Sequence, residues 1–210
     1  MFYFVKSPWL LKLLYPTCLW KVETKEKILY LTFDDGPHPV VTSWVLDLLN
    51  HYNAKATFFC IGNNVSQQTL TYEKIKGEGH AVGNHTYDHL NGWKTSDEIY
   101  LQNILKAKEI IHSNLFRPPY GRITNFQLRQ LSANAFKLRT VMWSVLSGDF
   151  DKDLSDEQCF LNVARNGKPG SIIVFHDSEK AFNKLKIVLP KVLDYFSKKG
   201  FKFESMDISR

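Results

Sequence analysis

Hydrophobic residues recur along the chain with two alternating spacings. Short continuous runs of apolar, β-branched and aromatic residues are typical of buried strands. Between these runs apolar residues recur every three or four positions, as in 40–52, which predicts amphipathic helices. The predicted strands span 28–33, 56–61, 80–84, 114–117, 137–143, 171–175 and 201–204.

Several predicted helices begin or end at recognisable residues. The helix at 67–76 stops at Gly77, and Ser155 with Gln158 forms a capping-box pattern that opens another. Pro190 must kink the last helix or lie near its start, because proline breaks the helical hydrogen-bond ladder. The predicted helices span 40–52, 67–76, about 97–111, about 125–133, 155–166 and 189–199.

Strands that alternate with helices favour an α/β fold with a parallel sheet. Seven such strands fit either an open doubly wound sheet or a barrel. The candidate polar residues favour the barrel, because they follow the carboxyl ends of several strands and those ends meet at one mouth in a barrel. These residues are Asp34, Asp35, His85, Arg117, Asp149 and His176.

Composition narrows the class of protein. A chain of 210 residues with 44% hydrophobic residues predicts one folded domain with a full core. The net charge of +6 is spread along the chain without a basic run, so we expect no nucleic-acid partner. Cys18, Cys60 and Cys159 are far apart, which argues against a disulfide framework or a cysteine zinc site.

The N-terminal segment, 1–26, differs from the rest and is assigned separately from a catalytic domain over 27–210. We expect a short helix in which Ser7 is the cap, Pro8 takes the first helical position and Pro16 marks the end. One face would carry Trp9, Leu10, Leu13 and Leu14.

That apolar face is expected to pack on the domain, with an interfacial membrane anchor through residues 1–20 as the alternative. Charged residues and prolines interrupt the segment, so no run is long enough to span a bilayer. No small-residue cleavage site follows. The location is therefore left open between cytoplasmic and membrane-peripheral.

Two adjacent carboxylates, Asp34 and Asp35, end the first predicted strand, and Gly36-Pro37 then turns the chain. Neighbouring buried carboxylates repel each other unless a cation or a partner offsets the charge. One of them can bind a metal ion while the other takes a proton from an attacking water.

His85 and His89 are four residues apart, which on a helical turn would place both imidazoles on one face and suit one metal ion. Two histidines and one aspartate make a typical catalytic zinc set with an open position. The remaining histidines are interpreted as surface or turn residues: His38, His51, His80 and His112.

Two further stretches carry candidate chemistry. In Arg117-Pro118-Pro119-Tyr120-Gly121 the prolines stiffen the turn and hold the Tyr120 N–H in a defined direction, as an oxyanion needs, while Arg117 can orient a carboxylate. His176 ends a buried strand and is a candidate general acid. Trp143 belongs either to the core or to a pocket wall.

Together these stretches, over roughly residues 27–205, resemble the polysaccharide deacetylases of carbohydrate esterase family 4. The matching blocks, in order, are Thr32–Pro37, His85–His89, Arg117–Gly121, a block ending at Asp149-Phe150, and Ile172–His176. The resemblance implies a distorted (β/α)-type barrel. It also implies removal of N-acetyl groups from a polymer or oligomer that contains N-acetylglucosamine, with Zn2+ (or Co2+ or Ni2+) as cofactor.

The resemblance also implies roles for individual residues. Asp34 would be the base, and the metal ligands would be Asp35, His85 and His89. Arg117 would position the base, the Tyr120 N–H would support the oxyanion, and Asp149 would tune His176 as the acid. Phe150, Trp143 and Tyr120 would line the substrate groove.

The fourth block departs from the family pattern. It reads Leu146-Ser147-Gly148-Asp149-Phe150, with leucine in place of the first aspartate and phenylalanine in place of the groove tryptophan. The identity of the glycan therefore stays open. The alternatives are an N-deacylase or amidase on a small non-sugar amide, an O-deacetylase, or an inactive carbohydrate-binding domain.

Overall fold

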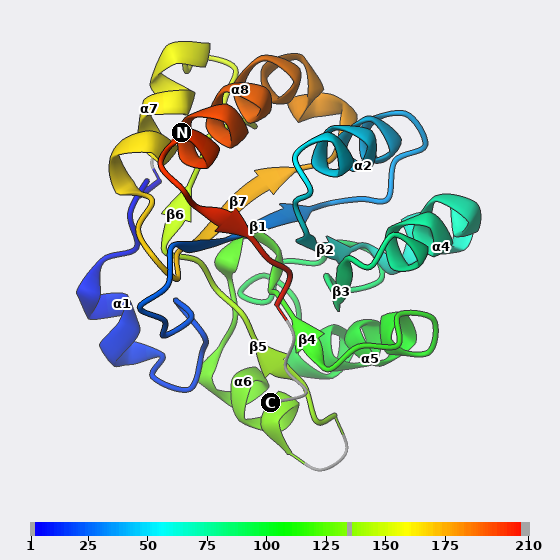
Figure 1. Cartoon of the computed structure of the whole chain (residues 1–210). Coiled ribbons are helices and arrows are strands. Elements are labelled where there is room, and N and C mark those ends of the chain that lie inside the picture. The colour runs from blue at the N-terminus through cyan, green and yellow to red at the C-terminus, as the bar shows by residue number, and fades with distance from the viewer. Residues whose placement is uncertain (1–2, 134–135, 207–210) are drawn as a thin grey trace.

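The computed structural model describes residues 3–133 and 136–206, and its centre is a curled sheet of parallel strands (Figure 1). The strand order is β5-β4-β3-β2-β1-β7-β6, and every neighbouring pair is parallel, while β8 pairs with the start of β1. The predicted seven-stranded barrel is confirmed. The strands are β1 Ile28–Asp34, β2 Ala56–Cys60, β3 Ala81–Asn84, β4 Leu115–Phe116, β5 Arg139–Thr140, β6 Val145–Leu146, β7 Ile172–His176 and β8 Lys202–Phe203.

The sequence did not predict β6, one of the seven strands in the order given above. β6 has two residues, too short for a pattern to show, yet it pairs with β7 through Val145 and Leu146. The predicted strand at 201–204 exists as β8, but it lies beside β1 and off the main path. The barrel therefore has seven strands on its path, one of them different from the seven predicted.

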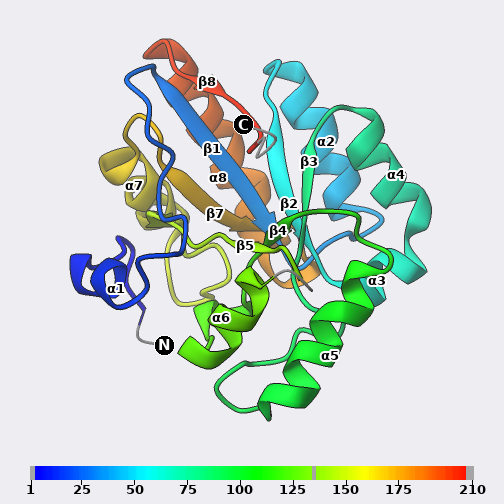
Figure 2. The ribbon, with the colours of Figure 1, turned by 90° about the horizontal axis from the view of Figure 1, so that it is seen from below.

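Helices surround the strands on the outside (Figures 1 and 2). The helix at 62–67 was not predicted, and the last helix starts earlier than its apolar pattern indicated, so that Pro190 lies well inside it. The helices are α1 Trp9–Leu14, α2 Val41–His51, α3 Gly62–Gln67, α4 Thr69–Gly77, α5 Asp97–Lys108, α6 Asn125–Ser132, α7 Asp156–Asn166 and α8 Glu179–Lys198, with a 3-10 turn, η1, at Pro119–Gly121.

The two faces of β1 have different chemistry because side chains alternate along a strand. Leu29, Leu31 and Phe33 point outward into the main hydrophobic core, which the helices cover. Phe33 stacks between Phe58 of β2 and Phe175 of β7, with ring centroids 5.1 and 6.1 Å away. Thr32 and Asp34 are left on the opposite face, toward the barrel interior.

The N-terminal segment closes the open side of the sheet between β5 and β6. Lys6 pairs with Val145 of β6, and Leu19 pairs with Val141 just beyond β5. These contacts satisfy backbone groups at both edges of the sheet, which would otherwise be exposed. Between them the chain forms α1.

Two expectations about α1 are wrong. Ser7 does not cap the helix, because its hydroxyl donates to the Trp143 carbonyl. The predicted apolar face does not pack on the domain either, since all four of its side chains are exposed. The helix contacts the core instead through Leu11, together with Tyr15 just after it. Among the described residues no helix is long and apolar enough to cross a bilayer.

His80, interpreted from the sequence as a surface or turn residue, is buried at the start of β3. Its Nδ1 accepts a hydrogen bond from the Ala56 N–H at 3.2 Å, and its ring packs edge-on against Phe58. Burial lowers the pKa of His80 to about 4, which keeps it neutral at pH 7. It therefore serves the core rather than the surface.

Candidate active site

The candidate residues meet because the strands end in register. Asp34 of β1 pairs with His176 of β7, so the two side chains lie side by side at the carboxyl end of the sheet. On the other side of β1, His85 follows the end of β3 and Arg117 follows the end of β4. The convergence predicted from the sequence is thus present in the structure.

Arg117 is fully buried and pairs with Asp34, with 2.7 Å between Nη1 and Oδ1. The same nitrogen donates to the Thr32 hydroxyl, also at 2.7 Å. Thr32 and Asp34 are two residues apart on β1 and share its interior face, so one guanidinium reaches both. A buried charge needs such a partner, because losing one member of a buried pair costs about 3–5 kcal/mol.

The rest of the Arg117 side chain is equally restrained. Its Nε and Nη2 donate to the carbonyls of Val141 and Met142, and its guanidinium lies 4.0 Å from the centroid of the Phe59 ring. The backbone carbonyl of Arg117 accepts a hydrogen bond from His85 Nδ1 at 2.7 Å. Arg117 therefore connects the carboxylate of Asp34 to the orientation of His85.

Asp35, His85 and His89 form a cradle whose three ligand atoms lie within 4.8 Å of one another. Asp35 Oδ1 is 3.6 Å from His85 Nε2 and 3.1 Å from His89 Nε2. Two ligands of a tetrahedral zinc ion are about 3.3 Å apart, given bonds of about 2.0–2.1 Å. The spacing and the donor types both fit one zinc-sized ion.

The pKa shifts of His85 and Asp35 favour the protonation states that bind a cation. Burial lowers the pKa of His85 to about 4, so this imidazole is neutral at pH 7, as a metal ligand must be. Burial alone would raise the pKa of Asp35, but the hydrogen bond from His89 and the nearby imidazoles hold it well below its usual value. Because Nδ1 of His85 donates to the Arg117 backbone carbonyl, Nε2 is the nitrogen that is left for a metal ion in the cradle.

The segment 85–89 is not helical, so the prediction of two imidazoles one helical turn apart is wrong in its geometry. Thr86 and His89 have positive φ values of 65° and 56°, which fold the segment into a compact loop. Asn103 of α5 accepts from the Tyr87 and Asp88 N–H groups, and its amide donates to the Asp88 carboxylate. The loop still brings both imidazoles to one point, and Asp88 faces α5.

His176 and Asp149 form a second oriented pair. Asp149 Oδ1 lies 2.8 Å from His176 Nδ1, and Asp149 Oδ2 accepts the His176 backbone N–H at 2.7 Å. Burial alone would lower the pKa of His176, but the charge and hydrogen bond of Asp149 raise it to about 10. The imidazole is therefore protonated at pH 7 and can donate a proton from Nε2.

Aromatic side chains stand around this mouth. The Phe150 ring lies 5.2 Å from His176, and the exposed Tyr120 ring lies 4.7 Å from His89. Trp143 is half-buried beside Arg117. Leu146, in contrast, is buried in β6. Of the two departures in the fourth block, only Phe150 faces the mouth.

A family model described as polysaccharide deacetylase matches residues 21–138, which is more than half of the chain. This chain belongs to the polysaccharide deacetylase family. The resemblance found in the sequence motifs is confirmed, and the family makes the chain a hydrolase of the deacetylase class.

Similar proteins agree with this family assignment. The chain is 37% identical over 190 residues to a peptidoglycan-N-acetylglucosamine deacetylase of Bacillus cereus, covering 88% of each chain. It is 34% identical over 164 residues to a chitooligosaccharide deacetylase of Azorhizobium caulinodans, covering 75% of this chain and 77% of that one.

A solved structure agrees with the fold. The structure of the Bc1960 peptidoglycan N-acetylglucosamine deacetylase, in complex with 4-naphthalen-1-yl-N-oxidanyl-benzamide, superposes with a TM-score of 0.85. It is 31% identical and covers 95% of each chain.

Sequence reasoning missed Asp177, which directly follows His176 and is fully buried. Its Oδ1 accepts the Gly36 N–H at 3.0 Å, and its Oδ2 accepts the Thr42 hydroxyl at 2.5 Å. Burial raises the pKa of this carboxyl to about 7, and the two hydrogen bonds offset part of its desolvation. The signal was present in the sequence, because a carboxylate after a buried strand needs a partner.

Asp177 helps to hold the turn that presents Asp35. Asn64 of α3 assists from the other side, because its amide donates to the Asp35 carbonyl at 2.7 Å. Asp35 itself has a positive φ of 79°, a backbone conformation that needs such support. The cradle thus depends on residues that do not contribute ligand atoms.

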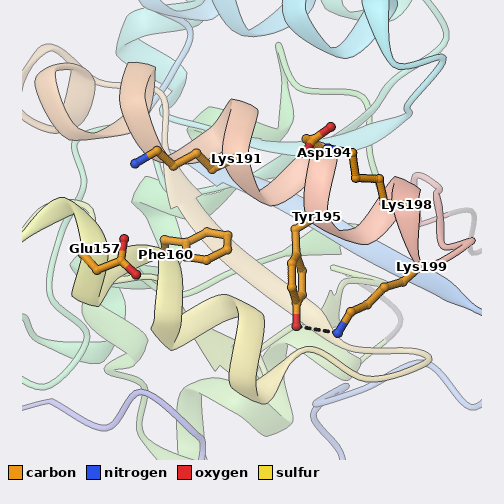
Figure 3. Close-up of a pocket in the computed structure, with 7 residues that line it drawn as sticks. All are labelled: Glu157, Phe160, Lys191, Asp194, Tyr195, Lys198 and Lys199. Carbon is orange, nitrogen blue, oxygen red and sulfur yellow. Dashed lines mark hydrogen bonds and ion pairs between the residues drawn. The ribbon is translucent and has the colours of Figure 1, made fainter.

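A separate surface hollow of about 430 Å³ lies between α7 and α8 (Figure 3). Its lining comes from the outer sides of these helices and from the residue that follows α8, and none of the residues of the mouth takes part. The lining residues are Glu157, Phe160, Lys191, Asp194, Tyr195, Lys198 and Lys199. The hollow is not part of the candidate active site.

The close approach of Gly36 and Asp177 predicts that Gly36→Ala is damaging. A Cβ at position 36 would lie 2.0 Å from Asp177 Oδ2, so the turn or the carboxylate must move. We expect a loss of about 2 kcal/mol in unfolding free energy, typical of overpacking, together with weaker binding of a metal ion at the cradle, for which zinc serves as the probe. Denaturant unfolding and zinc titration measure the two effects.

Gly77→Ala is the matched control, since a Cβ there meets nothing within 4 Å and Gly77 ends a helix. It should be neutral or slightly stabilising. Equal behaviour of the two variants would show that the turn does not depend on this contact.

Proposed function

We propose that this member of the family is a metal-dependent N-deacetylase of oligosaccharides or polysaccharides that contain N-acetylglucosamine. One observation carries the proposal. A three-ligand cradle, a carboxylate paired with a buried arginine, and a protonated imidazole paired with a carboxylate lie together at one end of the barrel. The similar proteins, which are named for peptidoglycan and chito-oligosaccharides, support the substrate class.

Zinc is the proposed ion, with cobalt or nickel as alternatives, held by Asp35, His85 and His89. Two nitrogens and one carboxylate oxygen are typical of a catalytic zinc site, and three protein ligands leave one position open. When bound there, the ion would polarise the acetamide carbonyl and acidify a water molecule.

Asp34 is the proposed proton acceptor. Its Oδ1 is engaged by Arg117 and Thr32 lies beside it, so the carboxylate has one defined orientation at the end of β1. The guanidinium also compensates the negative charge of this buried carboxylate. Asp34 would take a proton as water adds to the carbonyl carbon of the N-acetyl group.

The resulting oxyanion requires a donor. We assign this role to the Tyr120 backbone N–H, because the two prolines before it and the 3-10 turn fix the direction of the peptide. Tyr120 lies beside His89, so this peptide adjoins the cradle.

His176 is the proposed general acid for the leaving amine. When the carbon–nitrogen bond breaks, the sugar nitrogen takes the proton from Nε2 of His176, and acetate is the other product. Asp149 holds Nδ1 and keeps the ring protonated until that moment. Phe150, Trp143 and Tyr120 would form the walls that receive the sugar ring.

The first test is acetate release from N-acetylated chito-oligomers of increasing length and from peptidoglycan fragments. We expect release that needs added zinc or cobalt, stops with a chelator, and rises with oligomer length as more of the groove is filled. Release from a small amide or an acetyl ester, with none from the glycans, would favour the alternative substrates. No release from any substrate, with one metal ion bound per chain, would contradict the proposal.

Asp149→Asn tests the role of the second pair through pH. Without the carboxylate charge the pKa of His176 falls, so the acid loses its proton at a lower pH. We expect the alkaline limb of the kcat/KM profile to move down by at least about one pH unit, with a smaller loss of activity near pH 6.

Asp153→Asn, at an exposed carboxylate in the same loop, is the control and should leave the profile in place. If Asp149→Asn instead lowers kcat/KM by the same factor at every pH, then Asp149 has only a structural role.

A further inference from the structure

Helix α1 exposes an apolar face that nothing among the described residues covers. A helix whose residues are almost all apolar is normally buried. The inner side of α1 follows this rule, since Leu11 packs into the core. The outer side does not follow it, because its four large side chains are mostly exposed. The exposed fractions are 72% for Trp9, 53% for Leu10, 65% for Leu13 and 57% for Leu14.

This exposure is built into the fold, since both ends of the helix are tied to the sheet. Before it, the Ser7 N–H donates to the Ser144 carbonyl. After it, the Trp20 ring donates to the Tyr15 carbonyl, and the Leu19 N–H donates to the Thr140 carbonyl. In both views α1 lies at the margin of the molecule (Figures 1 and 2). A partner would therefore meet a preformed apolar surface.

The N-terminal segment that contains the helix carries charge of one sign. The first 22 residues contain three lysines and no acidic residue. Lys6 is exposed just before α1, and Lys12 lies on it. An apolar face flanked by lysines is typical of a segment that lies in the interface of a membrane with anionic lipids.

We propose that α1 docks on the surface of an anionic lipid bilayer, with its four exposed apolar side chains in the interfacial layer and the lysines near the headgroups. The helix is about 9 Å long, so it lies along the surface and does not cross it. Tryptophan is enriched at this depth of the bilayer. A second copy of the chain fits less well, because a stable dimer needs about 800 Å² per partner and one short helix offers far less.

The docked helix would lie close to the catalytic mouth. Tyr3 packs on Phe150 with ring centroids 5.1 Å apart, and Phe150 packs on His176. From Tyr3 to Trp9 the chain can span at most about 20 Å. The mouth would thus lie near glycans held at the bilayer surface; this consequence rests on the proposed function, whereas the docking itself does not.

Co-sedimentation of the full chain with vesicles tests the proposal. We expect binding to vesicles of phosphatidylcholine with phosphatidylglycerol and much weaker binding to phosphatidylcholine alone. Trp9→Gln with Leu13→Gln should weaken binding at least about tenfold. Lys6→Gln and Lys12→Gln should each weaken it about fivefold, and only on the anionic vesicles.

The matched control is Leu70→Gln, which changes an 88% exposed leucine on α4 and should leave binding unchanged. Circular dichroism and thermal unfolding check that every variant is folded. Binding that the double variant retains, or no binding of the unmodified chain to anionic vesicles, would overturn the proposal. Light scattering that detects a dimer lost in the double variant would assign the face to a second copy and overturn it as well.

Discussion

The arrangement of the site depends on one fully buried charge, the guanidinium of Arg117. An uncompensated charge in the barrel interior would cost several kcal/mol, so every element that meets it supplies a partner. Strand β1 supplies Asp34 and Thr32, and the chain after β5 supplies two carbonyls. The carbonyl of the same residue orients His85. One side chain and its own peptide thus link the proposed base to the proposed metal cradle.

The parallel sheet brings these residues close enough for Arg117 to reach them. Neighbouring strands end in register, so a residue at the end of β1 lies directly beside one at the end of β7 and close to the loops after β3 and β4. Alternation along β1 then separates the two tasks of the strand. Phe33 packs with the helices outside, whereas Thr32 and Asp34 face the interior. The fold and the site use opposite faces of the same short strand.

The sequence predicted the strands, the barrel and the family well, because apolar runs and strand-end polar residues are local signals. It did not predict β6, since two residues carry no periodicity. It placed His85 and His89 on one helical turn, but contacts from Asn103 of α5 fold that segment as a loop. Asp177 was missed and His80 was wrongly interpreted as a surface or turn residue for a similar reason, because their hydrogen-bond partners come from other segments. The outward face of α1 was predicted to be buried, because apolar patterns do not reveal which side meets the core.

Asp34 is proposed as the base and Asp35 as a metal ligand. The most direct test of these two roles compares Asp34→Asn with Asp35→Asn by zinc titration and by acetate release. For Asp34→Asn we expect zinc affinity close to that of the unmodified protein and turnover lower by about a thousandfold. For Asp35→Asn we expect zinc affinity lower by at least about tenfold, with turnover falling as the metal is lost. Near-normal turnover of the zinc-loaded Asp34→Asn protein, or unchanged zinc affinity in Asp35→Asn, would contradict the account.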